Sequence, residues 1–143
     1  MTDTRAVKYE QEIADIIQGL VGAQGVVDAQ AFDRKLNHLV KLRASQINGC
    51  AHCIKMHTKE ARRDGETNDR LDRVIVWEHV HDFSEKEKAA FAWTEALTVL
   101  DRKTDLGAIR ARLRDHFTEK EIGVLTSIIG MINLWNRIQV SRH

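Results

Sequence analysis

The segment that tells most about the fold is Asn48-Gly49-Cys50-Ala51-His52-Cys53-Ile54-Lys55-Met56-His57. Asn48-Gly49 is a turn signal between two segments whose apolar residues recur at helical spacing, so we expect a helix hairpin there. Cys50 then lies at the N-terminus of the second helix, and Cys53 lies one turn further on. At about 1.5 Å of rise per residue their Cα atoms are roughly 5 Å apart, within disulfide range. The hairpin therefore predicts a reversible dithiol.

The remainder of the chain also has the pattern of helices. It contains no proline, and its apolar residues do not alternate as they would in strands. We predict an all-α fold of about six to seven helices in one domain, residues 1–143. The first helix should end before a break at Gly22 and Gly25, and Asn68 should cap the fourth. The expected helices span residues 7–20, 28–46, 50–64, 68–78, 84–100, 106–114 and 118–140.

Two helix starts carry a specific signal. Ser84-Glu85-Lys86-Glu87 and Thr118-Glu119-Lys120-Glu121 match the capping box, in which a hydroxyl and a glutamate three residues later satisfy two backbone N–H groups. The helix that follows Thr118 is apolar on most of its circumference. We therefore expect it to be central or to lie at a subunit interface.

Composition and charge exclude several classes of protein. With 22 Lys and Arg against 21 Asp and Glu, the net charge of +1 provides no field for a nucleic-acid backbone. The first residues lack the apolar run of a signal peptide, and no stretch approaches the roughly 20 apolar residues of a membrane span. We expect a cytoplasmic protein. In a reducing compartment, a Cys-x-x-Cys pair is more often catalytic or metal-binding than structural.

A histidine is placed to serve one of the two thiols. His57 is the i+4 neighbour of Cys53, with Cα atoms about 6 Å apart on the same helix face, so a proton could pass between them. Cys50 and His57 are roughly 10 Å apart along the helix axis. The dipole of the helix alone would favour Cys50 as the more easily ionised thiol.

Two other interpretations of this segment stay open. The cysteines could be small buried residues that are neighbours by chance, or Cys50, Cys53, His57 and either His38 or His52 could bind zinc. Against zinc, the sequence offers no second cysteine pair.

His52 is as well explained by solvent or interface exposure as by function. We assign no role to three loop histidines, His79, His81 and His116. The tryptophans Trp77, Trp93 and Trp135 are expected in the core, although any of them could wall the thiol pocket.

The segment from Leu39 to Thr58 resembles the core signature of the alkylhydroperoxidase AhpD-like proteins, within the carboxymuconolactone decarboxylase superfamily. Further similarity lies in the segments from Phe83 to Thr98 and from Ile132 to Arg137, so the resemblance spans roughly residues 10 to 140. It implies an all-helical fold, assembly into trimers or hexamers, and a two-cysteine peroxidase or thiol-disulfide activity. No bound cofactor or metal is implied.

The resemblance also implies roles for individual residues. Cys53 would attack the peroxide, Cys50 would resolve the product to a disulfide, and His57 would relay protons. His38 stands where the family has a glutamate, twelve residues before the first cysteine. In an antiparallel hairpin at about 1.5 Å per residue, position 38 lies roughly 15 Å from the turn and His57 roughly 12 Å, so His38 and His57 should be near neighbours. Without the carboxylate we expect a mostly neutral His57, for which Glu60 is a substitute partner.

The sequence supports three functions. The first is an antioxidant peroxidase or disulfide reductase, with a hydroperoxide substrate and a lipoamide- or thioredoxin-like dithiol donor. The second is a redox-sensing protein, without catalysis, whose oligomer is remodelled when the pair oxidises. The third is decarboxylation of a lactone ring acid, as in the other branch of the superfamily, which does not depend on a Cys-x-x-Cys pair.

Overall fold

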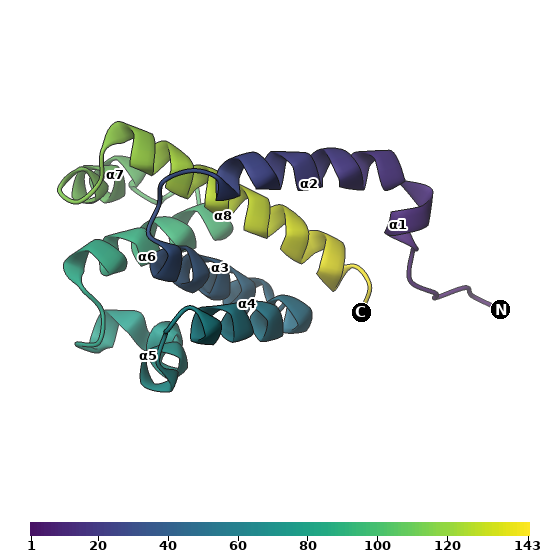
Figure 1. Cartoon of the computed structure of the whole chain (residues 1–143), viewed down its shortest axis with the longest axis horizontal. Coiled ribbons are helices and arrows are strands. Elements are labelled where there is room, and N and C mark those ends of the chain that lie inside the picture. The colour runs from purple at the N-terminus through teal and green to yellow at the C-terminus, as the bar shows by residue number, and fades with distance from the viewer.

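A computed structural model describes all residues, 1–143, and it is entirely helical. Eight α-helices and one 3-10 helix follow one another without a strand, which confirms the predicted all-α class. The number of helices is larger than the six or seven that we expected. Figure 1 shows the order of the helices along the chain. Their bounds are α1 Tyr9–Glu12, α2 Ala14–Asp28, α3 Arg34–Asn48, α4 Ala51–Arg63, α5 Asn68–Arg73, η1 Val74–His79, α6 Glu85–Thr98, α7 Leu106–Arg114 and α8 Glu119–Val140.

Helix α3 lies between two hydrophobic clusters and organises the core. Leu36 and Val40 point into a cluster shared with α6, α7 and α8, where Leu125 and Ile129 are buried. Leu39 and Leu42 lie in a second cluster with parts of α4, α5, η1 and α6. Residues three and four apart share one face of a helix, so two offset apolar stripes on α3 explain its burial on both sides.

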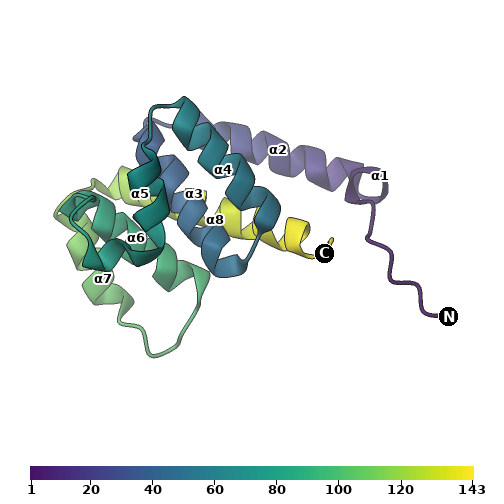
Figure 2. The ribbon, with the colours of Figure 1, turned by 90° about the horizontal axis from the view of Figure 1, so that it is seen from below.

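The predicted break at Gly22 and Gly25 is wrong. After a kink at Ile13, α2 continues through both glycines to Asp28. An interior glycine costs a helix about 1 kcal/mol relative to alanine, which packing can offset. Here α2 packs along α8, where Trp135 Nε1 donates a hydrogen bond of 2.9 Å to Gln24. In both views α1 and the adjoining part of α2 extend beyond the other helices (Figures 1 and 2).

Three other boundaries differ from the prediction. Helix α3 starts at Arg34 instead of residue 28, because Asp33 caps it by accepting from the Leu36 N–H. Thr67, not Asn68, caps α5, and the second half of that predicted helix is the 3-10 helix η1. Helix α6 ends at Thr98 instead of Leu100.

The capping signals located the other helix starts correctly. At Ser84 both hydrogen bonds of the capping box are present, and the Thr118 hydroxyl accepts from the Glu121 N–H. The helix after Thr118, α8, packs against α2, α3, α4, α6 and α7, which confirms that it is central. No helix is both long enough and apolar enough to cross a membrane.

Candidate functional site

Cys50 belongs to the end of one helix and to the start of the next. Gly49 has a φ of +65°, and its N–H and that of Cys50 bond to the carbonyls of Gln46 and Ser45. This is the Schellman arrangement that ends a helix at a glycine. Cys50 is also the N-cap of α4, where its Sγ accepts from the Cys53 N–H at 3.3 Å. The predicted hairpin at Asn48-Gly49 therefore presents the thiol pair at a helix N-terminus.

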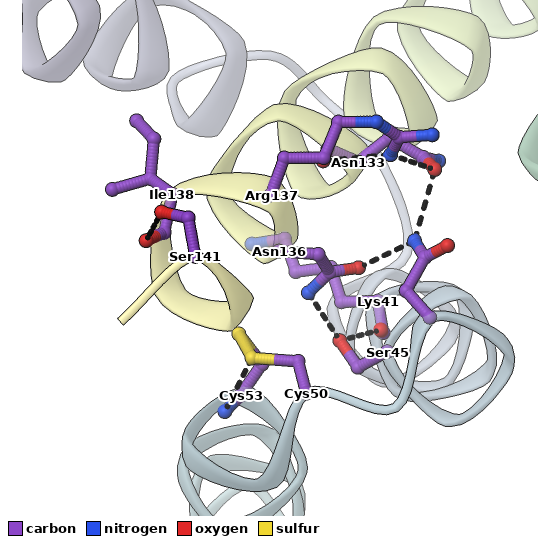
Figure 3. Close-up of a disulfide and its surroundings, with 10 residues drawn as sticks. Lys41, Ser45, Cys50, Cys53, Asn133, Asn136, Arg137, Ile138 and Ser141 are labelled. Carbon is purple, nitrogen blue, oxygen red and sulfur yellow. Dashed lines mark hydrogen bonds between the residues drawn. A yellow bond between two sulfur atoms is a disulfide. The ribbon is translucent and has the colours of Figure 1, made fainter. Parts of the chain in front are cut away.

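The two cysteines form a disulfide, and only one of them lines the neighbouring cavity. Their Cα atoms are 5.3 Å apart, in agreement with the spacing expected for a helical turn. Both side chains are buried, but only Cys53 lines a cavity. Figure 3 shows the disulfide at the first turn of α4, beside the C-terminal end of α8, where Ile138 and the C-cap residue Ser141 lie. A molecule in the cavity would reach Cys53 and not Cys50.

The cavity has a volume of about 580 Å³ and is bounded by α2, α3, α4 and α8. Its apolar wall includes Met56, Ile132 and Trp135. Polar and ionisable side chains line the remainder, among them His38, His57, Glu60 and Asp64. Of the three tryptophans, Trp77 and Trp93 are core residues, as expected, and Trp135 is the one that walls the thiol pocket.

His57 is held by Glu60 on the same helix. The His57 Nδ1 lies 3.2 Å from Glu60 Oε2, and because a carboxylate only accepts, Nδ1 carries the hydrogen. The other ring nitrogen, Nε2, is buried and has no hydrogen-bond partner. Burial lowers the pKa of His57, and the hydrogen bond to Glu60 opposes this in part. The result is a neutral imidazole whose free lone pair is on Nε2.

The expected proximity of His38 and His57 takes a specific form. Both line the cavity, and both approach the same carboxylate oxygen: His38 Nδ1 is 3.8 Å from Glu60 Oε2. His38 Nε2 lies 2.6 Å from Asp64 Oδ2. The expected neutrality of His57 agrees with its lowered pKa, but burial is the main cause and the charge of His38 contributes least. Glu60 does partner His57, as the sequence suggested.

Three polar contacts behind the disulfide were not predicted. Asn136, which is fully buried, donates to Ser45 Oγ at 3.0 Å and accepts from Asn48 Nδ2 at 2.9 Å (Figure 3). Asn48 also donates to Asn133 at 3.0 Å. These contacts attach the turn before Cys50 to α8. In the sequence, the segment from Ile132 to Arg137 stands out only through its resemblance to the family. The spacing of three between its two asparagines, which places both on one helix face, was the signal available for these contacts.

Asp64 was also missed as a site residue, since the sequence marked it only as the end of a helix. Its position four residues after Glu60 was the available signal, because such residues share a helix face. His52 is exposed and lies at the cavity. No group of three or more His, Cys, Asp or Glu side chains is arranged to hold a metal ion.

The model of the carboxymuconolactone decarboxylase family matches residues 11–96, a segment that contains α2 to α5 and nearly all of α6. The chain belongs to this family. The Cys-x-x-Cys hairpin and His57 lie in the matched segment, whereas α7 and α8 lie beyond that segment. The chain is of the AhpD-like kind, as its resemblance implied.

Two relatives of this family protein cover almost its whole length. An uncharacterized Bacillus subtilis protein, YdfG, is 33% identical over 96% of this chain and 94% of its own. A crystal structure from Agrobacterium tumefaciens, of a protein of unknown function described as a candidate antioxidant defence protein AhpD, superimposes with a TM-score of 0.91. It is 33% identical, and the match covers 97% of this chain and 95% of that one.

A more distant structure shares the fold alone. The debrominase Bmp8 in complex with 2,3,4-tribromopyrrole superimposes with a TM-score of 0.81 at 17% identity, over 92% of this chain and 70% of that one. Proteins of this fold therefore include a debrominase. The activity of this chain has to be argued from its own site.

Proposed function

We propose that this chain is a two-cysteine peroxidase that reduces hydroperoxides with electrons from a dithiol donor. One observation carries the proposal: of the two linked sulfurs, only that of Cys53 belongs to a residue that lines the cavity, together with His57. This asymmetry fits an attacking thiol at the surface and a resolving thiol behind it. Membership of the AhpD-like group supports the same chemistry.

The first half-reaction needs a base and then an acid at the same place. His57 Nε2 accepts the proton of the Cys53 thiol, and the thiolate attacks the terminal, hydroxyl-bearing oxygen of the hydroperoxide. The S–O bond forms as the O–O bond breaks, so Cys53 becomes a sulfenic acid and the peroxide is reduced. The departing alkoxide takes the proton back from His57 and leaves as an alcohol.

The second half-reaction regenerates the thiols. Cys50 Sγ attacks the sulfenic sulfur of Cys53, a disulfide forms, and the hydroxide that departs takes the Cys50 proton to become water. A dithiol donor of the lipoamide or thioredoxin type then reduces the disulfide by exchange and is itself oxidised to a disulfide. Cys53 is the sulfur that the donor attacks, because it is the one on the cavity.

We also propose that the protein assembles into a homo-oligomer, a trimer or a hexamer, and works in the cytoplasm. Helix α2 buries no residue within the chain, and its Ile16, Val21 and Val26 side chains are more than half exposed. A second copy that covered this surface would remove apolar area from water.

Peroxide consumption tests the proposal in the wild type, Cys50→Ser and Cys53→Ser, with several dithiol donors supplied. We expect turnover in the wild type and none in Cys53→Ser. The Cys50→Ser variant should give a single turnover and a sulfenic acid that a dimedone probe traps. Undiminished turnover in both variants would refute the site.

The redox-sensing alternative gives a different result in the same assay. A sensor would consume one equivalent of peroxide, form the Cys50–Cys53 disulfide and stop, whichever donor is present. Its elution volume in gel filtration would then change between the reduced and oxidised forms. Continued turnover with any dithiol donor would exclude that alternative.

A further inference from the structure

Asp64 and His38 join the two helices of the hairpin at the end away from the cysteines. His38 lies on α3, and Asp64 is the C-cap of α4. Their side chains are 10% and 15% exposed, and the contact of 2.6 Å between Nε2 and Oδ2 is short for a hydrogen bond between nitrogen and oxygen. A largely buried, charge-assisted bond of this kind fixes the orientation of the imidazole ring.

The fixed orientation determines where the second nitrogen of His38 points. Because Asp64 accepts the Nε2 hydrogen, the Nδ1 of His38 faces Glu60 Oε2 at 3.8 Å, beyond hydrogen-bond distance, and it is buried with no hydrogen-bond partner. An unprotonated nitrogen and an ionised carboxylate would both be acceptors and would repel. A proton on either atom removes this repulsion, and a proton on Nδ1 turns the contact into an ion pair.

We propose that Asp64 is a positioning residue that holds His38 so that His38 and Glu60 share one proton beside His57, which forms a relay Asp64–His38–Glu60–His57. The inference rests on the proposed peroxidase function of Cys53. Glu60 Oε2 is the common member, because His57 Nδ1 approaches it at 3.2 Å and His38 Nδ1 at 3.8 Å. The histidine at position 38 thus becomes part of the acid–base apparatus.

The relay moves one proton and returns it. When His57 Nε2 accepts the Cys53 proton, the Nδ1 hydrogen of His57 passes to Glu60 Oε2, and the shared proton moves fully to His38 Nδ1. His38 is then positive, with the Asp64 carboxylate at its Nε2 and the protonated Glu60 facing its Nδ1. When the O–O bond breaks, His57 Nε2 gives its proton to the alkoxide and each transfer reverses, so no net charge is left behind.

The charged groups around the cluster favour this arrangement. Arg34 on α3 and Arg63 on α4 lie 3.9 Å from Asp64 Oδ1, and the hydrogen bond from His38 lowers the pKa of Asp64. Asp64 therefore remains an acceptor. Lys41 on α3 pairs with Asp28 on α2 at 3.8 Å, and α8 presents only uncharged residues to the cavity, Ile132, Trp135 and Gln139.

The experiment compares Asp64→Asn in two backgrounds, wild type and His38→Glu. In the wild type, Asp64→Asn should lower kcat for peroxide about tenfold at unchanged KM, a part of the 10²–10⁴ that general acid–base catalysis contributes. In the His38→Glu background it should cause no loss, because there is no imidazole to position and two facing carboxylates repel. An equal loss in both backgrounds would show a structural role and overturn the proposal.

A control and a second variant protect this comparison. Asp69→Asn makes the same chemical change at an exposed acid on α5 and should alter neither kcat nor Tm. If Asp64→Asn does not fold, Asp64→Ser removes the carboxylate with a smaller side chain, and the same difference between backgrounds is expected. Equal activity of wild type and the Asp64 variant would also overturn the relay.

A readout that does not depend on activity separates this inference from the proposed function. The His38 Nε2 proton should give a downfield, slowly exchanging NMR signal that Asp64→Ala, which leaves no acceptor, removes, while the His57 Nδ1 signal remains. If the wild type reduces no peroxide but the signals behave in this way, the peroxidase function fails and the hydrogen-bonded relay stands. Persistence of the His38 signal in Asp64→Ala would overturn the relay even in an active enzyme.

Discussion

Glu60 Oε2 lies 3.2 Å from His57 Nδ1, and this contact decides which nitrogen of His57 can act on the thiol. With the hydrogen on Nδ1, the free lone pair is on Nε2, which is buried and unpartnered at the cavity. A carboxylate that orients an imidazole in this way is a recurrent arrangement of acid–base catalysis. Glu60 on α4 therefore makes the contact with His57 that the resemblance would lead us to expect from a glutamate at position 38 on α3.

Replacement of Glu60 by glutamine should lower kcat for peroxide reduction about tenfold or more, because the neutral amide has no negative charge to offset the proton that His57 takes from Cys53. KM should change little, since Glu60 does not lie on the apolar wall. The matched control is Glu78→Gln, which changes an exposed glutamate of η1 and should have no effect. Wild-type kcat in Glu60→Gln would show that His57 acts without this partner.

The pH dependence of His57 follows from the direction of its shift. Burial lowers its pKa below the ordinary 6.5, while Glu60 raises it in part. The imidazole should therefore be neutral, and able to accept a proton, at and above pH 6.5, and should protonate only at lower pH. Glu60→Gln removes the opposing effect, so its titration should move to still lower pH. An NMR titration of the His57 Cε1 proton measures the pKa of His57 in the wild type and in Glu60→Gln. A wild-type midpoint above 6.5 would contradict the conclusion that burial lowers this pKa.

The thiol site could be predicted from the sequence to a large extent, because it is local. The i+4 relation of Cys53 and His57 and the i+3 relation of His57 and Glu60 follow from helix geometry alone. The approach of His38 to His57 also followed, because the two residues lie eleven and eight residues from Gly49 along the two helices of the hairpin. The partner of His38 did not follow, since a side chain at the frayed end of a helix has no fixed direction.

The parts of the fold that were missed depend on contacts between distant segments. Gly22 and Gly25 would end an isolated helix, but packing on α8 carries α2 through them. The last turns of the predicted helix after Asn68 become the 3-10 helix η1, whose Trp77 donates a hydrogen bond of 2.8 Å to Glu95 on α6. Likewise, the contacts of Asn136 depend on the rotation of α8 against α3, which no local pattern specifies.

Replacement of Asn136 by alanine should lower the free energy of unfolding by about 2 to 3 kcal/mol, because Ser45 loses a donor and the Asn48 amide loses an acceptor in a buried region. The change also frees the turn before Cys50, so the disulfide should be reduced faster by a dithiol. Urea denaturation measures the first effect. Asn68→Ala, at an exposed position of α5, is the control and should stay within about 0.5 kcal/mol of wild type. Equal stability of the two variants would show that the buried amide is dispensable.

Gly49 should be the glycine that the site tolerates losing least. Its φ of +65° is left-handed, which costs a side-chain-bearing residue about 1 to 2 kcal/mol, and the cysteine that follows it depends on this turn. Gly49→Ala should therefore destabilise the protein by about that amount and slow peroxide reduction. Gly123→Ala is the matched control: it lies within α8, where an added Cβ meets nothing within 4 Å, and helix propensity favours alanine by up to about 1 kcal/mol. Thermal denaturation of both variants should give shifts of Tm in opposite directions, and a Gly49→Ala variant as stable as Gly123→Ala would show that the backbone at the turn can rearrange without moving Cys50.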